Sequence, residues 1–307
     1  MSKDLENSII RIVVLLCVSF VFLVFGCGKT LAADDQQEMA ERIPIETVST
    51  DGFTMNYFKF GQGERTLVIL PGLSVQGVMN SAEQIVSAYQ PLAEDFTIYV
   101  FDPRNELPAS YSVADMAEDT ARVFLTLGLE DVCIMGASMG GMTALEMAVC
   151  HPELIDKMVL VSTAVQMKEE QFQALDEWIS LAQEGKAQDL YLAFGKAVYP
   201  EETYEQIQET LTEASKTVTE DELKHFVILA DSLRDFDITN ELDKIECPVL
   251  AINDKDDRVL GSEAVETMEQ YMNQRPDWVF YMYDGYGHAV YDTAPDLKDR
   301  MLEFFRQ

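Results

Sequence analysis

Short apolar runs rich in β-branched residues recur along the chain, and the longer segments between them repeat their apolar residues at helical spacing. This alternation is typical of strands that are buried on both faces and connected by crossover helices. The runs that we expect to form core strands are residues 66–70, 96–101, 132–135, 158–161, 249–252 and 278–282. The pattern therefore predicts a mostly parallel sheet with helices on both faces.

Two earlier segments, 45–49 and 53–60, flank the dipeptide Asp51-Gly52, which favours a tight turn between antiparallel strands. We expect them to form a hairpin at one edge of the sheet. The predicted fold class is therefore α/β, with an eight-stranded sheet.

Several predicted helices have residues at their ends that suit those positions. Ser112 and Asp115 are expected to cap a helix that runs to about Leu127. Near the C-terminus, Thr293 followed by Pro295 predicts the start of the last helix.

The strand pattern disappears in the middle of the chain and four helical patterns follow one another, at residues 168–184, 188–198, 201–215 and 220–235. Thr219 and Glu222 have the spacing of a capping box at the start of the last one. We interpret this stretch as a helical cap inserted into one α/β domain. The expected cap is 167–237, and the expected core comprises 45–166 and 238–307.

Residues 1–28 differ in character from the rest. An uncharged apolar run, 12–28, follows Arg11 and lies at the lower limit for a spanning helix, yet it is slightly long for a signal-peptide core. We expect an export or anchoring element here. Residues 29–44 are polar and acidic, which indicates a tether.

The end of this run resembles a bacterial lipoprotein signal, in which a small residue precedes a cysteine that becomes lipidated after cleavage. Gly26 and Cys27 match that pattern, while Phe25 departs from it. The hypothesis is an extracytoplasmic protein held at a membrane through lipid on Cys27. An uncleaved membrane helix and simple secretion are the alternatives.

Composition narrows the class of partner. The 307 residues are 48% hydrophobic, enough for one large globular domain, and their formal net charge is -32. Such a charge repels phosphate backbones and argues against a nucleic-acid partner. We therefore expect a small-molecule substrate and contact with a membrane through the N-terminus only; the oligomeric state stays open.

The cysteines and histidines of the body do not suggest a metal site. Cys133, Cys150 and Cys247 are expected to be small buried residues, and neither they nor the three histidines have zinc-binding spacing. No metal and no cofactor are expected.

The stretch from Val132 to Leu145 contains the main chemical signal. An apolar strand runs directly into Gly-Ala-Ser-Met-Gly and then into a helical pattern, the context that a nucleophile elbow requires. At the tip of such a strand-to-helix turn, Ser138 would take a strained conformation, with Gly136 and Gly140 where side chains would collide. Ser138 is therefore the predicted nucleophile.

A serine hydroxyl needs a base to remove its proton, and the base needs a carboxylate partner. His288 follows the last predicted strand in a glycine-flanked loop, whereas His151 precedes a proline and His225 lies within a cap helix. His288 is the predicted base. Asp256 and Asp257 both follow strand 249–252, so either could be the acid. The order Ser, Asp, His is that of α/β-hydrolases.

Acyl transfer also needs hydrogen-bond donors for the developing oxyanion. The predicted donors are two backbone amides. One belongs to Met139, at the start of the helix after Ser138, and the other to Leu73, in the loop that follows strand 66–70.

These motifs together resemble an α/β-hydrolase of the fold-1 type over about residues 45–305. Further similarities are Phe101-Asp102-Pro103-Arg104, His151-Pro152-Glu153 and Gly287-His288. Three positions depart from the family pattern: Pro71 replaces a histidine, Asn105 a glycine, and Asp254 the glycine common three residues before the acid. Because that spacing ends at Asp257, the resemblance favours Asp257 over Asp256. Asp102 is interpreted as structural.

The resemblance implies a serine hydrolase that cleaves a small to medium neutral ester through an acyl-enzyme on Ser138. Aminopeptidase, carbon–carbon bond hydrolase and perhydrolase activities use the same triad and stay open. A surface-anchored binding protein without turnover is the alternative from another class.

Overall fold

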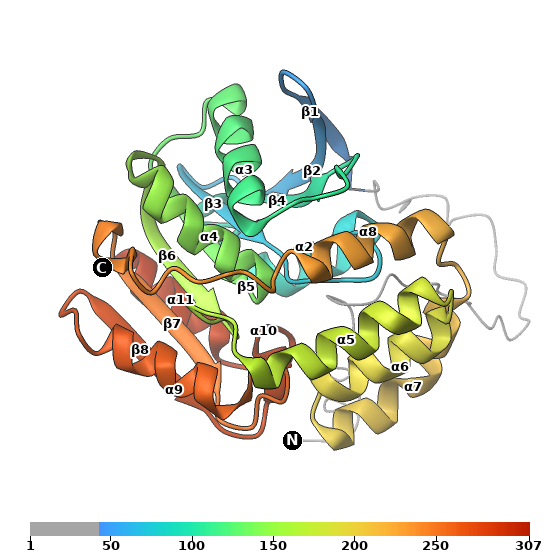
Figure 1. Cartoon of the computed structure of the whole chain (residues 1–307). Coiled ribbons are helices and arrows are strands. Elements are labelled where there is room, and N and C mark those ends of the chain that lie inside the picture. The colour runs from blue at the N-terminus through green and yellow to red at the C-terminus, as the bar shows by residue number, and fades with distance from the viewer. Residues whose placement is uncertain (1–42) are drawn as a thin grey trace, which may run out of the picture.

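The computed structural model describes residues 43–307, and the statements below concern that part of the chain. An eight-stranded sheet with the order β1-β2-β4-β3-β5-β6-β7-β8 forms its centre (Figure 1). The strands are β1 (Glu46–Ser49), β2 (Thr54–Phe60), β3 (Arg65–Leu70), β4 (Phe96–Arg104), β5 (Val132–Ala137), β6 (Ile155–Val161), β7 (Val249–Asp254) and β8 (Trp278–Tyr283).

The sheet is mixed. From β4 to β8 every neighbouring pair is parallel, whereas β1 with β2 and β2 with β4 are antiparallel. The edge hairpin is confirmed, and each expected core strand is present. Strand β4 is longer than its apolar pattern predicts, because its end at Arg104 still pairs with Met55 of β2.

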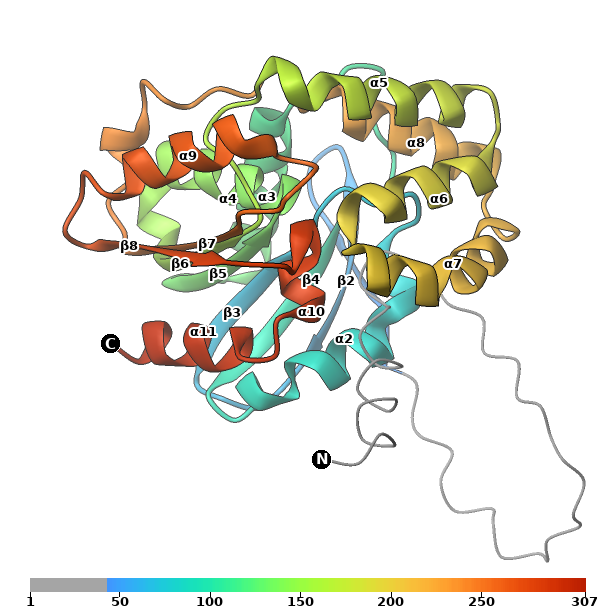
Figure 2. The same ribbon diagram turned by 90° about the horizontal axis from the view of Figure 1, so that it is seen from below.

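Helices cover both faces of the sheet. Figure 2 shows α3 (Val113–Leu127), α4 (Met139–Cys150) and α9 (Gly261–Met272) on one face, and α2 (Ala82–Tyr89) and α11 (Leu297–Arg306) on the other. All six residues of β5 are buried, as expected for a central strand covered on both sides. The sheet therefore fixes the end of β5 firmly.

The predicted cap of α3 is confirmed, because Ser112 and Asp115 form a reciprocal capping box. The prediction for the last helix is wrong. Thr293 ends the short helix α10 (Val290–Thr293), where its hydroxyl donates to the Ala289 carbonyl, and α11 starts only after Asp296. The turn of α10 continues the loop that contains His288.

Four helices lie between β6 and β7 in the chain: α5 (Glu169–Gln183), α6 (Ala187–Val198), α7 (Glu201–Ser215) and α8 (Glu220–Asp231). They form one group beside the sheet (Figures 1 and 2). The capping box of Thr219 and Glu222 at α8 is present. Gln166 and Asp237 form an antiparallel bridge, so the chain leaves and re-enters the core at adjacent points.

One expectation about the cysteines is wrong. Cys133 and Cys247 are buried, but Cys150, the last residue of α4, is exposed. All three are free thiols.

The proposed anchor and tether, with Cys27, lie outside the described residues. Within residues 43–307, no helix combines the length and the apolar character that crossing a bilayer requires.

Candidate active site

Ser138 lies at a sharp turn between β5 and α4. Its φ of 51° and ψ of -118° are rare for a residue with a side chain, and this strain is typical of a nucleophile elbow. The turn is held on both sides. The Ser138 amide donates to the Val161 carbonyl at 2.9 Å, and the Ser138 carbonyl accepts from the amides of Gly141 and Met142.

The two glycines of the motif are required by close backbone approach. A Cβ on Gly140 would lie 2.0 Å from the Leu70 carbonyl oxygen, and a Cβ on Gly136 would lie 2.6 Å from the Gly140 carbonyl oxygen. Neither neighbour can move without shifting β3 or α4. The tight turn thus depends on both glycines.

His288 and Asp257 are hydrogen-bonded, with 2.7 Å between His288 Nδ1 and Asp257 Oδ2. The other carboxylate oxygen of Asp257 accepts the amides of Val259 and Leu260, each at 2.9 Å. A carboxylate can only accept, so Nδ1 carries the proton and Nε2 has a free lone pair. Both side chains are almost fully buried, at 3% and 0% exposure. The pair is arranged as an oriented base.

The alternative acids lie elsewhere. Asp256 has an exposed side chain and no hydrogen bond to His288. Asp102 accepts the amide of Val78 at 2.8 Å, and burial raises the pKa of its carboxyl to about 6. Asp102 lies in β4 and binds the first amide of the helical turn Val78–Ser81, which is consistent with the structural interpretation of this residue.

The other two histidines are separate from this pair. His151 directly follows α4, and its Nε2 lies 2.9 Å from Glu118 of α3. His225 lies in α8 and lines a groove that Asp102 also lines. The glycine-flanked loop was the signal that distinguished His288 from them.

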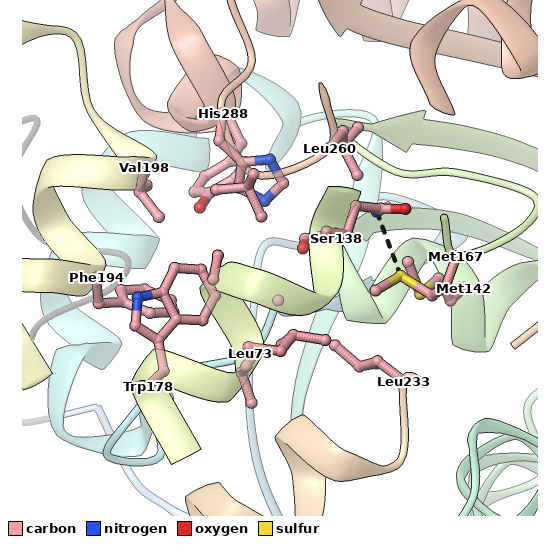
Figure 3. A pocket seen from close by; sticks show the side chains of 16 residues that line it. Leu73, Ser138, Met142, Met167, Trp178, Phe194, Val198, Leu233, Leu260 and His288 are labelled. Atoms are coloured by element: carbon pink, nitrogen blue, oxygen red, sulfur yellow. Dashed lines mark hydrogen bonds between the residues drawn. The ribbon is translucent and has the colours of Figure 1, made fainter. Parts of the chain in front are cut away.

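A pocket joins Ser138 and His288 (Figure 3). Its empty space amounts to about 520 Å³, part of which is open to solvent. Most of its walls are apolar and come from the helical insertion and the core loops, including Met142, Leu175, Trp178, Phe194, Val198, Leu233 and Leu260. No Asp, Glu, Lys or Arg side chain from residues 43–307 lines it.

The two predicted oxyanion donors lie on either side of the elbow. Leu73 borders the pocket, and its neighbour Gly72 is so near that a Cβ there would lie 3.1 Å from Ser138 Cβ. Met139 is the first residue of α4, and its side chain borders the neighbouring groove instead. Their amide roles stay predictions.

Sequence reasoning missed two polar residues whose hydrogen bonds support the backbone of the elbow at Ser138. The hydroxyl of Thr163 donates to the Ser138 carbonyl at 2.8 Å, and Asn253 donates its side-chain N–H to the Thr163 carbonyl at 3.1 Å. Both residues are fully buried. Thr163 follows the end of β6, and Asn253 is near the end of β7. This was the available signal, because polar residues at the carboxyl ends of parallel strands meet at one edge of the sheet.

Comparison with known proteins also indicates a hydrolase. Residues 65–295 match the family described as the alpha/beta hydrolase fold. A relative from Agrobacterium fabrum named carbamate hydrolase RutD is 28% identical over 243 residues, which cover 74% of this chain and 90% of the relative. Serine hydrolase BPHL of Mus musculus is 30% identical over 132 residues, which cover 40% of this chain and 44% of that protein.

Among solved structures, MGS-M2, an alpha/beta hydrolase enzyme from a Medee basin deep-sea metagenome library, has a TM-score of 0.75 at 19% identity. The superposition covers 85% of this chain and 98% of that chain. The family match spans β3 to β8 and contains Ser138, Asp257 and His288. The chain therefore belongs to the α/β-hydrolase fold family and is a hydrolase of that fold.

Proposed function

We propose that this hydrolase cleaves neutral carboxylic esters of small to medium size through an acyl-enzyme on Ser138. The observation that carries the proposal is the hydrogen bond of Asp257 to His288, because the His288 side chain borders the same apolar pocket as the strained Ser138. No cofactor takes part in the proposed reaction, because an activated serine and water supply both nucleophiles.

In the first step, His288 Nε2 takes the proton of Ser138 Oγ while Oγ attacks the ester carbonyl carbon. Asp257 keeps the proton on Nδ1 and stabilises the imidazolium that forms. The amides of Leu73 and Met139 hold the oxyanion. The tetrahedral intermediate then expels the alcohol, which receives its proton from His288.

In the second step, His288 takes a proton from water and the resulting hydroxide attacks the acyl carbon. The new tetrahedral intermediate releases the acid, and Ser138 Oγ recovers its proton from His288. The cycle leaves the enzyme unchanged and consumes one water for each ester.

The pocket walls support a neutral substrate. A charged group would lose its hydration there without gaining a partner, because no Asp, Glu, Lys or Arg within residues 43–307 lines the pocket. Two relatives are named carbamate hydrolase and serine hydrolase, which fits attack on a carbonyl carbon without fixing the ester. Amide hydrolysis, carbon–carbon bond hydrolysis and peracid formation are therefore assayed separately from ester hydrolysis.

We predict that kcat/KM for p-nitrophenyl esters peaks at an intermediate acyl length and exceeds that for amino-acid arylamides. Phe194→Val should shift the peak to longer chains, because Phe194 lines the pocket at its contact with Trp178. Room for two further methylenes, at ~0.8 kcal/mol each, corresponds to about a tenfold change in the octanoate-to-butyrate ratio.

The matched control is Phe172→Val. Phe172 lies on α5, is only partly buried and does not line the pocket. Equal changes in both variants, measured after circular dichroism has confirmed folding, would contradict the assignment of the acyl pocket. A clear preference for amino-acid arylamides would replace the esterase proposal with a peptidase.

We also propose that residues 1–28 hold the enzyme at the outer face of a membrane. The support is the apolar run 12–28 after Arg11 and the lipoprotein-like sequence at Cys27. Deletion of 1–28 is expected to move the activity from the membrane fraction to the soluble fraction. Full-length protein found entirely in the soluble fraction would reject the anchor, and mass spectrometry of the N-terminal peptide tests lipid on Cys27.

A further inference from the structure

We propose that Asp254 is a positioning residue that locks the loop bearing Asp257 to the loop bearing His288. This inference rests on the proposed function, because it concerns the geometry of that same pair. The resembling family commonly has glycine at this position, so the lock is a feature of this chain.

The Asp254 carboxylate joins two segments that are far apart in sequence. Asp254 is the last residue of β7 and is fully buried. Its Oδ1 accepts the amide of Asp256 at 2.8 Å, and its Oδ2 accepts the amide of Tyr286 at 2.9 Å. One oxygen therefore holds the residue before Asp257, while the other holds the residue two positions before His288.

Backbone contacts place this link between the ends of two paired strands. Asp254 pairs with Tyr283, the last residue of β8, and its carbonyl accepts the Asp257 amide at 3.3 Å. Beyond Tyr283 the loop passes through Gly285 and Gly287, both with positive φ. Glycine allows this path but does not restrain it. The Asp254 carboxylate supplies the restraint.

The chemistry of the link explains why an aspartate suits this place. A buried carboxylate must be hydrogen-bonded, and hydrogen bonds to a charged acceptor are stronger than neutral ones. Both oxygens are occupied by amides of the two loops, so a displacement of either loop would leave buried charge without a partner. The 2.7 Å contact between His288 and Asp257 is thus held from both sides.

The same two loops also share an ion pair at the surface, which provides a matched control. Lys255 Nζ lies 2.6 Å from Asp284 Oδ2, and the two side chains are 54% and 68% exposed. Exposed pairs of this kind contribute little because water screens them. Asp284→Asn therefore removes a carboxylate that joins the same loops without touching the buried link.

The test compares Asp254→Asn and Asp254→Gly with Asp284→Asn in the otherwise unchanged chain. Asparagine keeps the volume but offers one oxygen to two amides, and glycine breaks both bonds. We expect kcat on a p-nitrophenyl ester to fall about ten- to a hundredfold in both Asp254 variants, with KM within about twofold, because small misplacements of reacting groups cost this much. Asp284→Asn should stay within about twofold of wild type.

Proton NMR of the resting enzyme gives a second readout that needs no turnover. The proton between His288 Nδ1 and Asp257 should give a downfield resonance that broadens or disappears in the Asp254 variants and persists in Asp284→Asn. Each rate is divided by the concentration of active sites titrated with a fluorophosphonate, so that a smaller amount of folded protein does not lower the measured kcat.

Wild-type kcat per site with an unchanged resonance in Asp254→Asn would overturn the inference, as would equal losses in Asp284→Asn. Failure of the proposed function has a different signature. In that case Ser138→Ala would remain active, whatever the resonance of the His288 proton does in the Asp254 variants.

Discussion

Ser138→Ala and His288→Ala are each expected to lower kcat by about 10⁴-fold or more while the protein stays folded. Alanine at 138 removes the atom that forms the acyl-enzyme, and alanine at 288 removes the base that makes this atom nucleophilic. Because the two residues act as one unit, the double variant should be no slower than either single variant. Stopped-flow or endpoint hydrolysis of an activated ester measures all three.

The control is the folded state of each variant. Ser138 sits at an unusual backbone geometry that alanine also tolerates only with strain, so thermal unfolding of Ser138→Ala should resemble that of wild type. More than about a tenth of wild-type activity in folded Ser138→Ala would show that another residue attacks the substrate.

Asp257→Asn is expected to reduce kcat by up to about 10⁴-fold, whereas Asp256→Asn should have only a small effect. The hydrogen bonds explain the difference. The amides of Val259 and Leu260 require an oxygen acceptor on one side of residue 257, so the amide NH₂ of asparagine would face His288. Nδ1 would then have to accept, and the proton would move to Nε2, where it blocks the base.

Asp256 provides the matched comparison, since it is the same residue type, one position away and exposed. The pair of variants is compared by kcat on one ester at one pH. A larger loss in Asp256→Asn would contradict the observed pairing. Equal and mild losses would place the acid elsewhere, with Asp102 as the first residue to substitute.

The parts of the fold that follow local patterns could be predicted from the sequence. An apolar strand, Gly-Ala-Ser-Met-Gly and a helical pattern identify the elbow, because its geometry requires glycines at fixed spacing from the serine. The glycine-flanked loop after the last strand identified His288. The choice of Asp257 over Asp256 depended on a family spacing, and it agrees with the hydrogen bond to His288.

Features that depend on contacts between distant segments could not be predicted in this way. The role of Thr163 follows from its hydrogen bond to Ser138, and that of Asp254 from an amide beyond the next strand. The extension of β4 to Arg104 arises from pairing with β2, and no apolar run marks it. Local sequence contains neither the partner nor the register of such contacts.

The most direct test of an acyl-transfer mechanism is peptide mapping of the protein after reaction with a fluorophosphonate. A single adduct on Ser138 is predicted, absent from Ser138→Ala and formed far more slowly in His288→Ala, because phosphonylation needs the same activated oxygen as attack on an ester. Labelling at another residue, or full ester hydrolysis by a protein whose Ser138 stays unlabelled, would contradict Ser138 as the nucleophile.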